Sequence, residues 1–261
     1  MTLPRTSTAL ATAALVLSTA ACGGGGGTAA PASSSSAALS TSAAPPAPSS
    51  APPSAAAITE QSAEAAADKI NLQAADLPGF QAVPSDDTDS KELDKLEDEM
   101  AKCLGASTED PLQEVVSDDF AKGSQLPALL ASSSVAFVDD PERVRQDVAA
   151  LKSDNGPDCL ATFTKRIFTQ AAGGAGVKFS DPAVEELTPA GAPGVETFGF
   201  TVTSKAQAQG QSVPFTLTLL GAGTQRTETS LFMLGVGTEV PADQRDALFA
   251  KLVERTSANA L

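Results

Sequence analysis

The spacing of apolar residues changes partway along the chain, and this change restricts the fold more than any other feature. Leu160, Phe163 and Ile167 are three and four residues apart, which is the spacing of an amphipathic helix. Over residues 197–203 and 213–219, apolar residues instead alternate with polar residues that are mostly threonine, as in a half-buried strand. Short connections between such strands indicate an antiparallel meander. The period therefore changes between the helix that ends near Gly173 and the last helix of the chain, which predicts an antiparallel meander in that interval.

Turn and capping signals place the expected elements around this sheet. Helices are expected from Asp89 to Gly105, from Asp140-Pro141 to Leu151, from Gly156-Pro157 to Gly173, from Pro241 to Thr256 and, as a short piece, from Ala63 to Ala67. Further strands are expected at residues 115–117, 133–138, 184–187 and 226–236. These patterns predict an α+β fold in which an antiparallel sheet of about five to six strands carries helices mainly on one face.

Residues 1–21 have the pattern of a secretory signal peptide. Arg5 precedes the apolar stretch Leu10–Leu17, which is too short to cross a membrane as a mature helix. Small residues then lead to Cys22, which resembles a bacterial lipobox, so we predict that Cys22 is diacylated, with palmitate, and anchors the chain. The alternative is cleavage at an Ala-x-Ala-like site that leaves Cys22 as a free thiol.

Residues 22–57 are predicted to form a tether between the lipid and the folded part. After Cys22, this stretch contains only Gly, Ala, Ser, Thr, Pro and the single Leu39, without any charge. Such a composition cannot bury enough apolar surface to compensate for the entropy lost on ordering. We therefore expect one folded domain at residues 58–261, held on the extracytoplasmic face of the cell membrane.

Cys103 and Cys159 are the two cysteines of this expected domain. Thiols oxidise outside the cytoplasm, and two cysteines allow only one connectivity, so we predict a Cys103–Cys159 disulfide. It would join the end of the helix that stops at Gly105 to the start of the helix that follows Gly156. A metal or redox role is the alternative, although the chain has no His and no CxxC motif.

The chain is strongly acidic, with a formal net charge of −15. Because Arg5 is the only charge before Glu60, all 32 acidic residues and all but one of the 17 basic residues lie in the expected domain. Acidic residues gather at residues 85–119 and basic residues at 143–178. This pattern is typical of solvated helix faces or, alternatively, of charged surfaces that bind a partner. The net charge should repel nucleic acid and anionic lipid, so no nucleic acid partner is expected.

Short motifs spread over the expected domain resemble those of a known family. They are residues 75–80 (ADLPGF), 103–104 (CL), 134–137 (SVAF), 158–160 (DCL) and 253–255 (VER). Together they are similar to actinobacterial extracytoplasmic lipoproteins and sensor-like domains, with the extracellular domains of PknH-type serine/threonine kinases as distant relatives. The resemblance implies a cell-envelope lipoprotein domain from a family whose function is mostly undefined. The sensor domains carry more cysteines and a Trp that this chain lacks, so the resemblance does not imply a shared ligand.

No catalytic, metal or cofactor site is predicted. Without His, the chain lacks Ser–His and Cys–His pairs as well as the commonest metal ligand. It also lacks the GxSxG, SxxK, HExxH and P-loop motifs. Asp86, Asp87 and Asp89 lack the Gly and Glu that an EF-type calcium loop requires, and a helix cap explains Asp89. The acidic residues offer carboxylate pairs for glycoside hydrolysis, but no aromatic sugar platform accompanies them.

The function favoured by the sequence is non-enzymatic binding of an envelope ligand or partner protein. The expected contact is the polar face of the sheet or a neighbouring groove, and the polar face carries Thr197, Thr201, Thr203, Thr216 and Thr218. The favoured explanation of these threonines is that they are ordinary strand formers. A lipid or lipoglycan carrier is the first alternative and needs a large apolar cavity, and a cell-wall hydrolase is the second.

Acylation of Cys22 predicts how the protein partitions. Replacing Cys22 with Ala removes the thiol that carries the lipid, so the variant should leave the membrane fraction or accumulate unprocessed. Membrane partitioning of both proteins, measured by fractionation and immunoblotting, tests this expectation. A Cys22→Ala variant that is processed and sediments with membranes like the wild type would contradict it.

Overall fold

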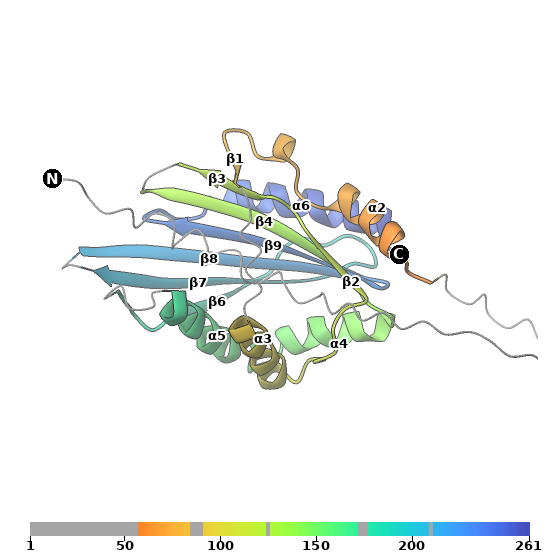
Figure 1. Ribbon diagram of the computed structural model, residues 1–261, viewed down its shortest axis with the longest axis horizontal. Coiled ribbons are helices and arrows are strands. Elements are labelled where there is room, and N and C mark those ends of the chain that lie inside the picture. Colours follow the sequence, from red (N-terminus) through yellow and green to blue (C-terminus); the bar gives the residue numbers. More distant parts are fainter. Residues whose placement is uncertain (1–56, 84–90, 124–125, 172–176, 209–210) are drawn as a thin grey trace, which may run out of the picture. The chain divides into compact units, whose positions relative to one another are not determined.

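The computed structural model describes residues 57–83, 91–123, 126–171, 177–208 and 211–261, and these contain one antiparallel sheet flanked by helices (Figure 1). The predicted signal peptide, Cys22, the tether and the Asp86–Asp89 stretch lie outside these residues. The strands are β1 (Gln81–Val83), β2 (Gln113–Val116), β3 (Asp119–Lys122), β4 (Ala128–Phe137), β5 (Lys178–Phe179), β6 (Ala183–Leu187), β7 (Glu196–Ala208), β8 (Gln211–Thr224) and β9 (Thr227–Val236).

The strands pair in the order β1-β3-β4-β9-β8-β7-β5, with β2 beside β4 and β6 beside β7. The expected meander is present, because β7, β8 and β9 follow one another in the chain and in the sheet. Strand β4 then pairs with β9, from Ala128 opposite Val236 to Phe137 opposite Thr227. The sheet has nine strands, more than the predicted five to six. The additional strands β1, β3 and β5 contain two to four residues, too few to show a two-residue alternation.

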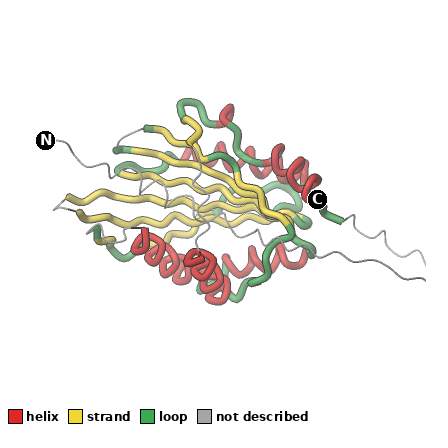
Figure 2. Tube along the Cα trace, viewed as in Figure 1, coloured by secondary structure: helices red, strands yellow, loops and turns green. Residues whose placement is uncertain are grey.

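The described residues contain five α-helices. Figure 2 shows the helices in red on the two sides of the yellow strands. Helices α3, α4 and α5 lie on one side and α2 and α6 on the other. A short 3-10 helix, η2 (Ala74–Asp76), connects α2 towards β1. No helix of the described residues is both long and apolar enough to cross a bilayer. The α-helices are α2 (Glu60–Ile70), α3 (Lys91–Leu104), α4 (Pro141–Leu151), α5 (Gly156–Ala171) and α6 (Ala242–Asn259).

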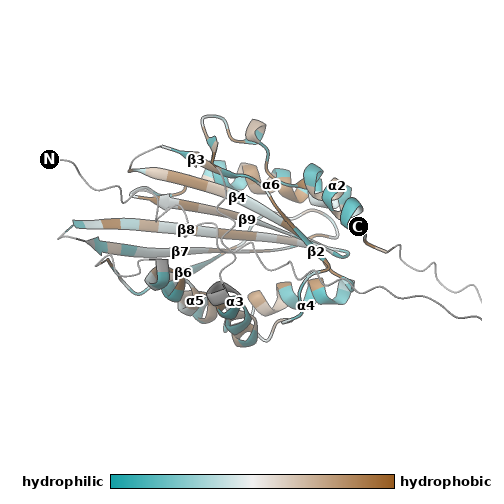
Figure 3. Cartoon of the chain, viewed as in Figure 1, coloured by the Kyte–Doolittle hydropathy of each residue, from teal (hydrophilic) through white to brown (hydrophobic). Residues whose placement is uncertain are grey.

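Alternation along β8 separates two hydrophobic cores. Figure 3 shows the strands coloured by the hydropathy of each residue. Phe215 and Leu217 point to the side of α5, which we call the α5 face, and Leu220 and Ala222 point to the side of α6, the α6 face. The Leu231–Leu234 run of β9 is buried on both faces, as its continuous apolar sequence predicted. The sequence predicts helices mainly on one face of the sheet. Helices α3, α4 and α5 lie together on the α5 face, but α2 and α6 also cover much of the α6 face.

Local signals explain where the helices begin and end. The Asp140 carboxylate accepts a hydrogen bond from the Glu142 amide at 2.9 Å, which caps α4 ahead of Pro141 in its first turn. Gly105 stops α3 in the left-handed region at a φ of 71°, a conformation that glycine adopts without strain.

The predicted disulfide is present. It joins the end of α3 at Cys103 to the first turn of α5 at Cys159, with Cα atoms 5.8 Å apart.

The disulfide should contribute strongly to stability. It closes a loop with a sequence separation of 56, and in the loop-entropy model its loss lowers the free energy of unfolding by about 4 kcal/mol. Urea unfolding of wild type and of the Cys103→Ser/Cys159→Ser variant measures this difference. Peptide mapping of the unreduced protein should show the Cys103 and Cys159 peptides linked. Free thiols at both positions, or equal stability of the two proteins, would contradict the expectation.

Candidate functional site

The ADLPGF motif is joined to the last helix by a buried ion pair. The Asp76 carboxylate, 6% exposed, accepts two hydrogen bonds of 2.8 Å from the two terminal nitrogens of the Arg255 guanidinium. It accepts a third hydrogen bond of 3.0 Å from the Gln73 backbone amide, and the Lys251 ammonium lies 3.3 Å away. Two motifs that stand at opposite ends of the folded sequence, ADLPGF and VER, therefore meet in one contact.

The surroundings of Asp76 keep its carboxylate ionised. Burial by itself would raise the pKa of Asp76, but the hydrogen bonds from Arg255, Gln73 and Lys251 outweigh this effect and lower it. A bidentate guanidinium–carboxylate pair of this kind fixes both partners in orientation as well as in charge. Asp76 is thus a structural carboxylate and is not available as a proton donor near neutral pH.

A second polar contact holds the same segment to the sheet. The Ser133 hydroxyl donates to the Asn71 side-chain oxygen at 2.9 Å and accepts from the Leu72 amide at 2.9 Å. The Asn71 side-chain amide donates to the Val115 carbonyl at 3.1 Å, and Arg255 donates to the Asn71 carbonyl at 3.0 Å. The segment that follows α2 is therefore fixed on both β4 and α6, which gives the adjacent surface a defined shape.

A groove lies beside this ion pair, between α6, the ADLPGF segment and β3. We call it the α6 groove. Its volume is about 340 Å³, within the range of small-molecule sites. The residues that line it are Asp76, Pro78, Lys122, Gln244, Ala247, Leu248 and Lys251.

Two lysines make the α6 groove suitable for an anionic ligand. Lys122 extends from β3, with its Nζ atom 5.9 Å from the centre of the Phe80 ring, and Lys251 extends from α6. Lys251 and Arg255 share the single Asp76 carboxylate, so that one negative charge cannot balance both of these cations together with Lys122. Lysine ammonium groups bind phosphate and carboxylate as point charges, and Pro78 and Leu248 offer apolar contact. Sequence reasoning missed this groove because its residues come from segments far apart in the chain.

The predicted threonine face is only partly available. Register brings Thr201 opposite Thr218 and Thr203 opposite Thr216. However, Thr218 is 1% exposed and pairs with Met233 of the α6-face core, so it cannot contact a partner. Thr203 is exposed, and Thr197, Thr201 and Thr216 are half-buried. Thr197 also donates a hydrogen bond to the Pro189 carbonyl at 3.2 Å.

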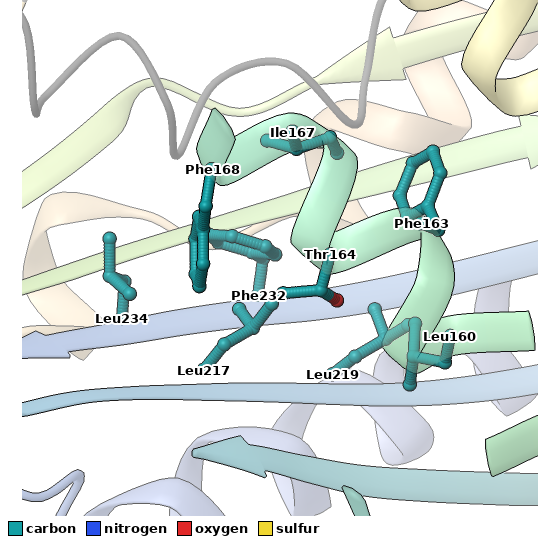
Figure 4. A pocket seen from close by; sticks show the side chains of 9 residues that line it. All are labelled: Leu160, Phe163, Thr164, Ile167, Phe168, Leu217, Leu219, Phe232 and Leu234. Atoms are coloured by element: carbon teal, nitrogen blue, oxygen red, sulfur yellow. The ribbon is translucent and has the colours of Figure 1, made fainter. Parts of the chain in front are cut away.

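The apolar space between α5 and the sheet is small (Figure 4). Its volume is about 10 Å³, on the order of a single water molecule. Figure 4 shows the Thr164 hydroxyl among otherwise carbon-only side chains, and this buried oxygen has no hydrogen-bond partner.

A second groove of about 300 Å³ lies between the start of α4 and the β8–β9 turn, with Arg145 and Glu196 as its charged residues. In the described part of the chain, no group of three or more Cys, Asp or Glu residues is placed to hold a metal ion.

The ion pair at Asp76 predicts sensitivity to acid. Its folded-state pKa lies below the unfolded one, so its stabilisation is full above the unfolded pKa and is lost as pH falls through the folded pKa. Replacing Asp76 with Asn should lower the free energy of unfolding near pH 6 by about 2–3 kcal/mol and flatten its decline below pH 4.

Urea unfolding at pH 6, 4 and 3 measures both effects. Asp181→Asn is the matched control, because Asp181 pairs with Lys165 at the surface with 85% of its side chain exposed. This control should leave stability nearly unchanged. Equal stability of Asp76→Asn and wild type at pH 6 would show that the buried Asp76–Arg255 pair does not stabilise the fold.

No protein-family model and no curated protein matches the chain. Among solved structures, it is similar to LpqN, described as involved in cell envelope biogenesis of Mycobacterium tuberculosis, at 13% identity and a TM-score of 0.24, over 56% of this chain and 78% of LpqN. It is also similar to the extracellular domain of PknH from Mycobacterium tuberculosis, at 11% identity and a TM-score of 0.30, over 69% of this chain and all of that domain. Similarity at this level assigns the chain to no family.

Proposed function

We propose that the protein is a lipoprotein, anchored through acylated Cys22, whose folded part binds a small anionic ligand in the α6 groove on the extracytoplasmic side of the membrane. The observation that carries this proposal is the meeting of Lys122 and Lys251 in a groove of about 340 Å³. Two cations in one groove give this site a local positive charge although the chain as a whole carries a net charge of −15.

The residues of the α6 groove suit ligand binding rather than catalysis. Arg255 and Lys251 hold the Asp76 carboxylate in its charged form, so Asp76 serves the fold and not proton transfer. The other lining residues are two lysines, one glutamine and three apolar residues, which can attract, orient and bury a ligand. This set offers no pairing of a nucleophile with a general base, which favours a non-enzymatic role.

The alternatives draw less support. A lipid or lipoglycan carrier needs a large apolar cavity, whereas the apolar space beside α5 is about 10 Å³. Thr201, Thr203 and Thr216 remain a proposed contact surface for an envelope protein, since each keeps part of its surface exposed. No distance or charge at these threonines selects a partner, so the groove is the favoured site.

A phosphate titration tests the proposal directly. Adding inorganic phosphate to the isotope-labelled protein should shift the amide resonances of residues 76, 77, 79 and 80 and of residues 244–251 in a saturable way. Each lysine is expected to contribute about 1 kcal/mol, so the Lys122→Ala/Lys251→Ala variant should bind phosphate at least about tenfold more weakly.

The matched control is Lys178→Ala/Lys205→Ala, which removes two exposed lysines from β5 and β7 and changes the net charge equally. This variant should bind phosphate like the wild type and keep its thermal midpoint. Phosphate shifts that do not saturate, or equal weakening in both variants, would refute a specific site in the groove.

A further inference from the structure

A tight turn in the ADLPGF motif, at residues 77–80, forms part of the wall of the α6 groove. The Phe80 amide donates a hydrogen bond of 3.0 Å to the Leu77 carbonyl, which closes the turn. Pro78 is followed by Gly79, whose φ of 83° lies in the left-handed region, and this order is typical of a type II turn. The turn therefore holds the exposed Pro78 ring in a fixed position at the groove.

The side chain of Lys122 lies along the same turn. Its Nζ atom is 5.9 Å from the centre of the Phe80 ring, and a methyl group at position 79 would lie 3.9 Å from its Cε atom. The aliphatic part of Lys122 thus passes beside Gly79 and Phe80, which restricts the positions of the ammonium group. A restricted cation loses less conformational entropy than a mobile one when it binds an anion.

Helix α6 supplies an apolar surface next to a cation. Gln244, Ala247, Leu248 and Lys251 all line the groove, and their spacing places them on one side of the helix. Ala247 and Leu248 lie between Gln244 and Lys251, which are about 10 Å apart along the helix axis. An anion held by Lys251 therefore has an apolar surface within one helical turn.

The charged residues at the groove leave a local positive charge. Asp76 is the one acidic residue among the described residues that line it, and both Lys251 and Arg255 contact this carboxylate. Together with Lys122, three cations share one carboxylate, which leaves two positive charges. The acidic residues of α6 and the acidic residue that precedes β3 do not line the groove, and these are Asp243, Asp246, Glu254 and Asp118.

We propose that the ligand of the α6 groove is a phosphate monoester with a compact apolar substituent, an inference that rests on the anion site proposed above. Near neutral pH such an ester carries close to two negative charges, which match the local charge. The phosphate binds Lys122 and Lys251, and the substituent contacts Pro78, Ala247 and Leu248. The volume of about 340 Å³ lies at the lower end of small-molecule sites, so it has room for more than inorganic phosphate.

Two sources can supply a phosphate monoester, a soluble molecule and the headgroup of phosphatidic acid in a bilayer. The net charge of −15 opposes approach to an anionic bilayer, which favours the soluble ester. Sedimentation of the unacylated Cys22→Ala chain with phosphatidylcholine vesicles, with and without phosphatidic acid, separates the sources. Binding that requires phosphatidic acid and is lost in Lys122→Ala/Lys251→Ala would assign the ester to the lipid.

Phenyl phosphate, phenyl sulfate and inorganic phosphate test the ligand class on the isotope-labelled full-length protein. Phenyl phosphate should bind about tenfold more tightly than inorganic phosphate, because its ring buries apolar surface. It should also bind about tenfold more tightly than phenyl sulfate, which has the same ring and one negative charge. Its affinity should rise from about pH 5 to about pH 7, as the ester loses its second proton.

A pair of alanine variants tests where the ring lies. Ala247→Gln fills the apolar surface without a change of charge, so the advantage of phenyl phosphate over inorganic phosphate should disappear. Ala250→Gln makes the same change at an exposed position of α6 that does not line the groove, and it should keep this advantage.

The outcomes separate this inference from the proposed function. Saturable binding of inorganic phosphate without tighter binding of phenyl phosphate would overturn the inference and leave the anion site standing. The inference also fails if phenyl sulfate binds as tightly as phenyl phosphate, or if the advantage of phenyl phosphate persists in Ala247→Gln. Inorganic phosphate that does not bind in a saturable way contradicts the proposed function itself.

Discussion

Strands β8 and β9 are apolar on both faces where Leu219–Leu220 lies beside the Leu231–Leu234 run, and the arrangement of the whole fold depends on this constraint. Neither face of such strands can be left to water, because each buried apolar side chain contributes about 1.5–3 kcal/mol relative to exposure. The chain therefore supplies helices to both sides, with α3, α4 and α5 on the α5 face and α2 and α6 on the α6 face.

On each face of the sheet, the covering elements are held together by one contact between residues far apart in the sequence. The Cys103–Cys159 disulfide ties α3 to α5 on one face, and the Asp76–Arg255 pair ties the segment after α2 to α6 on the other, across a sequence separation of 179. The two differ in what disturbs them, since a disulfide responds to reductants and an ion pair to acid. The α6 groove lies beside the Asp76–Arg255 pair, because Asp76 is one of its lining residues.

Periodicity predicted most of the fold and little of the site. The alternation in β7 and β8 and the continuous Leu231–Leu234 run indicated the meander and its double burial, because local spacing reflects the faces of an element. Strand β3 was missed, since four residues show no alternation. Burial of Thr218 and proximity of Lys122 to Lys251 depend on pairing and packing between distant segments, which spacing along one segment does not encode.

The central claim is that the Asp76–Arg255 pair holds the ADLPGF segment on α6 and so maintains the groove. A double-mutant cycle on the free energy of unfolding at pH 6, with Asp76→Asn, Arg255→Gln and the double variant, tests it most directly. A buried bidentate pair predicts a coupling energy of at least about 2 kcal/mol, with the double variant little worse than either single one. A coupling below about 0.5 kcal/mol, typical of exposed pairs, would contradict the account.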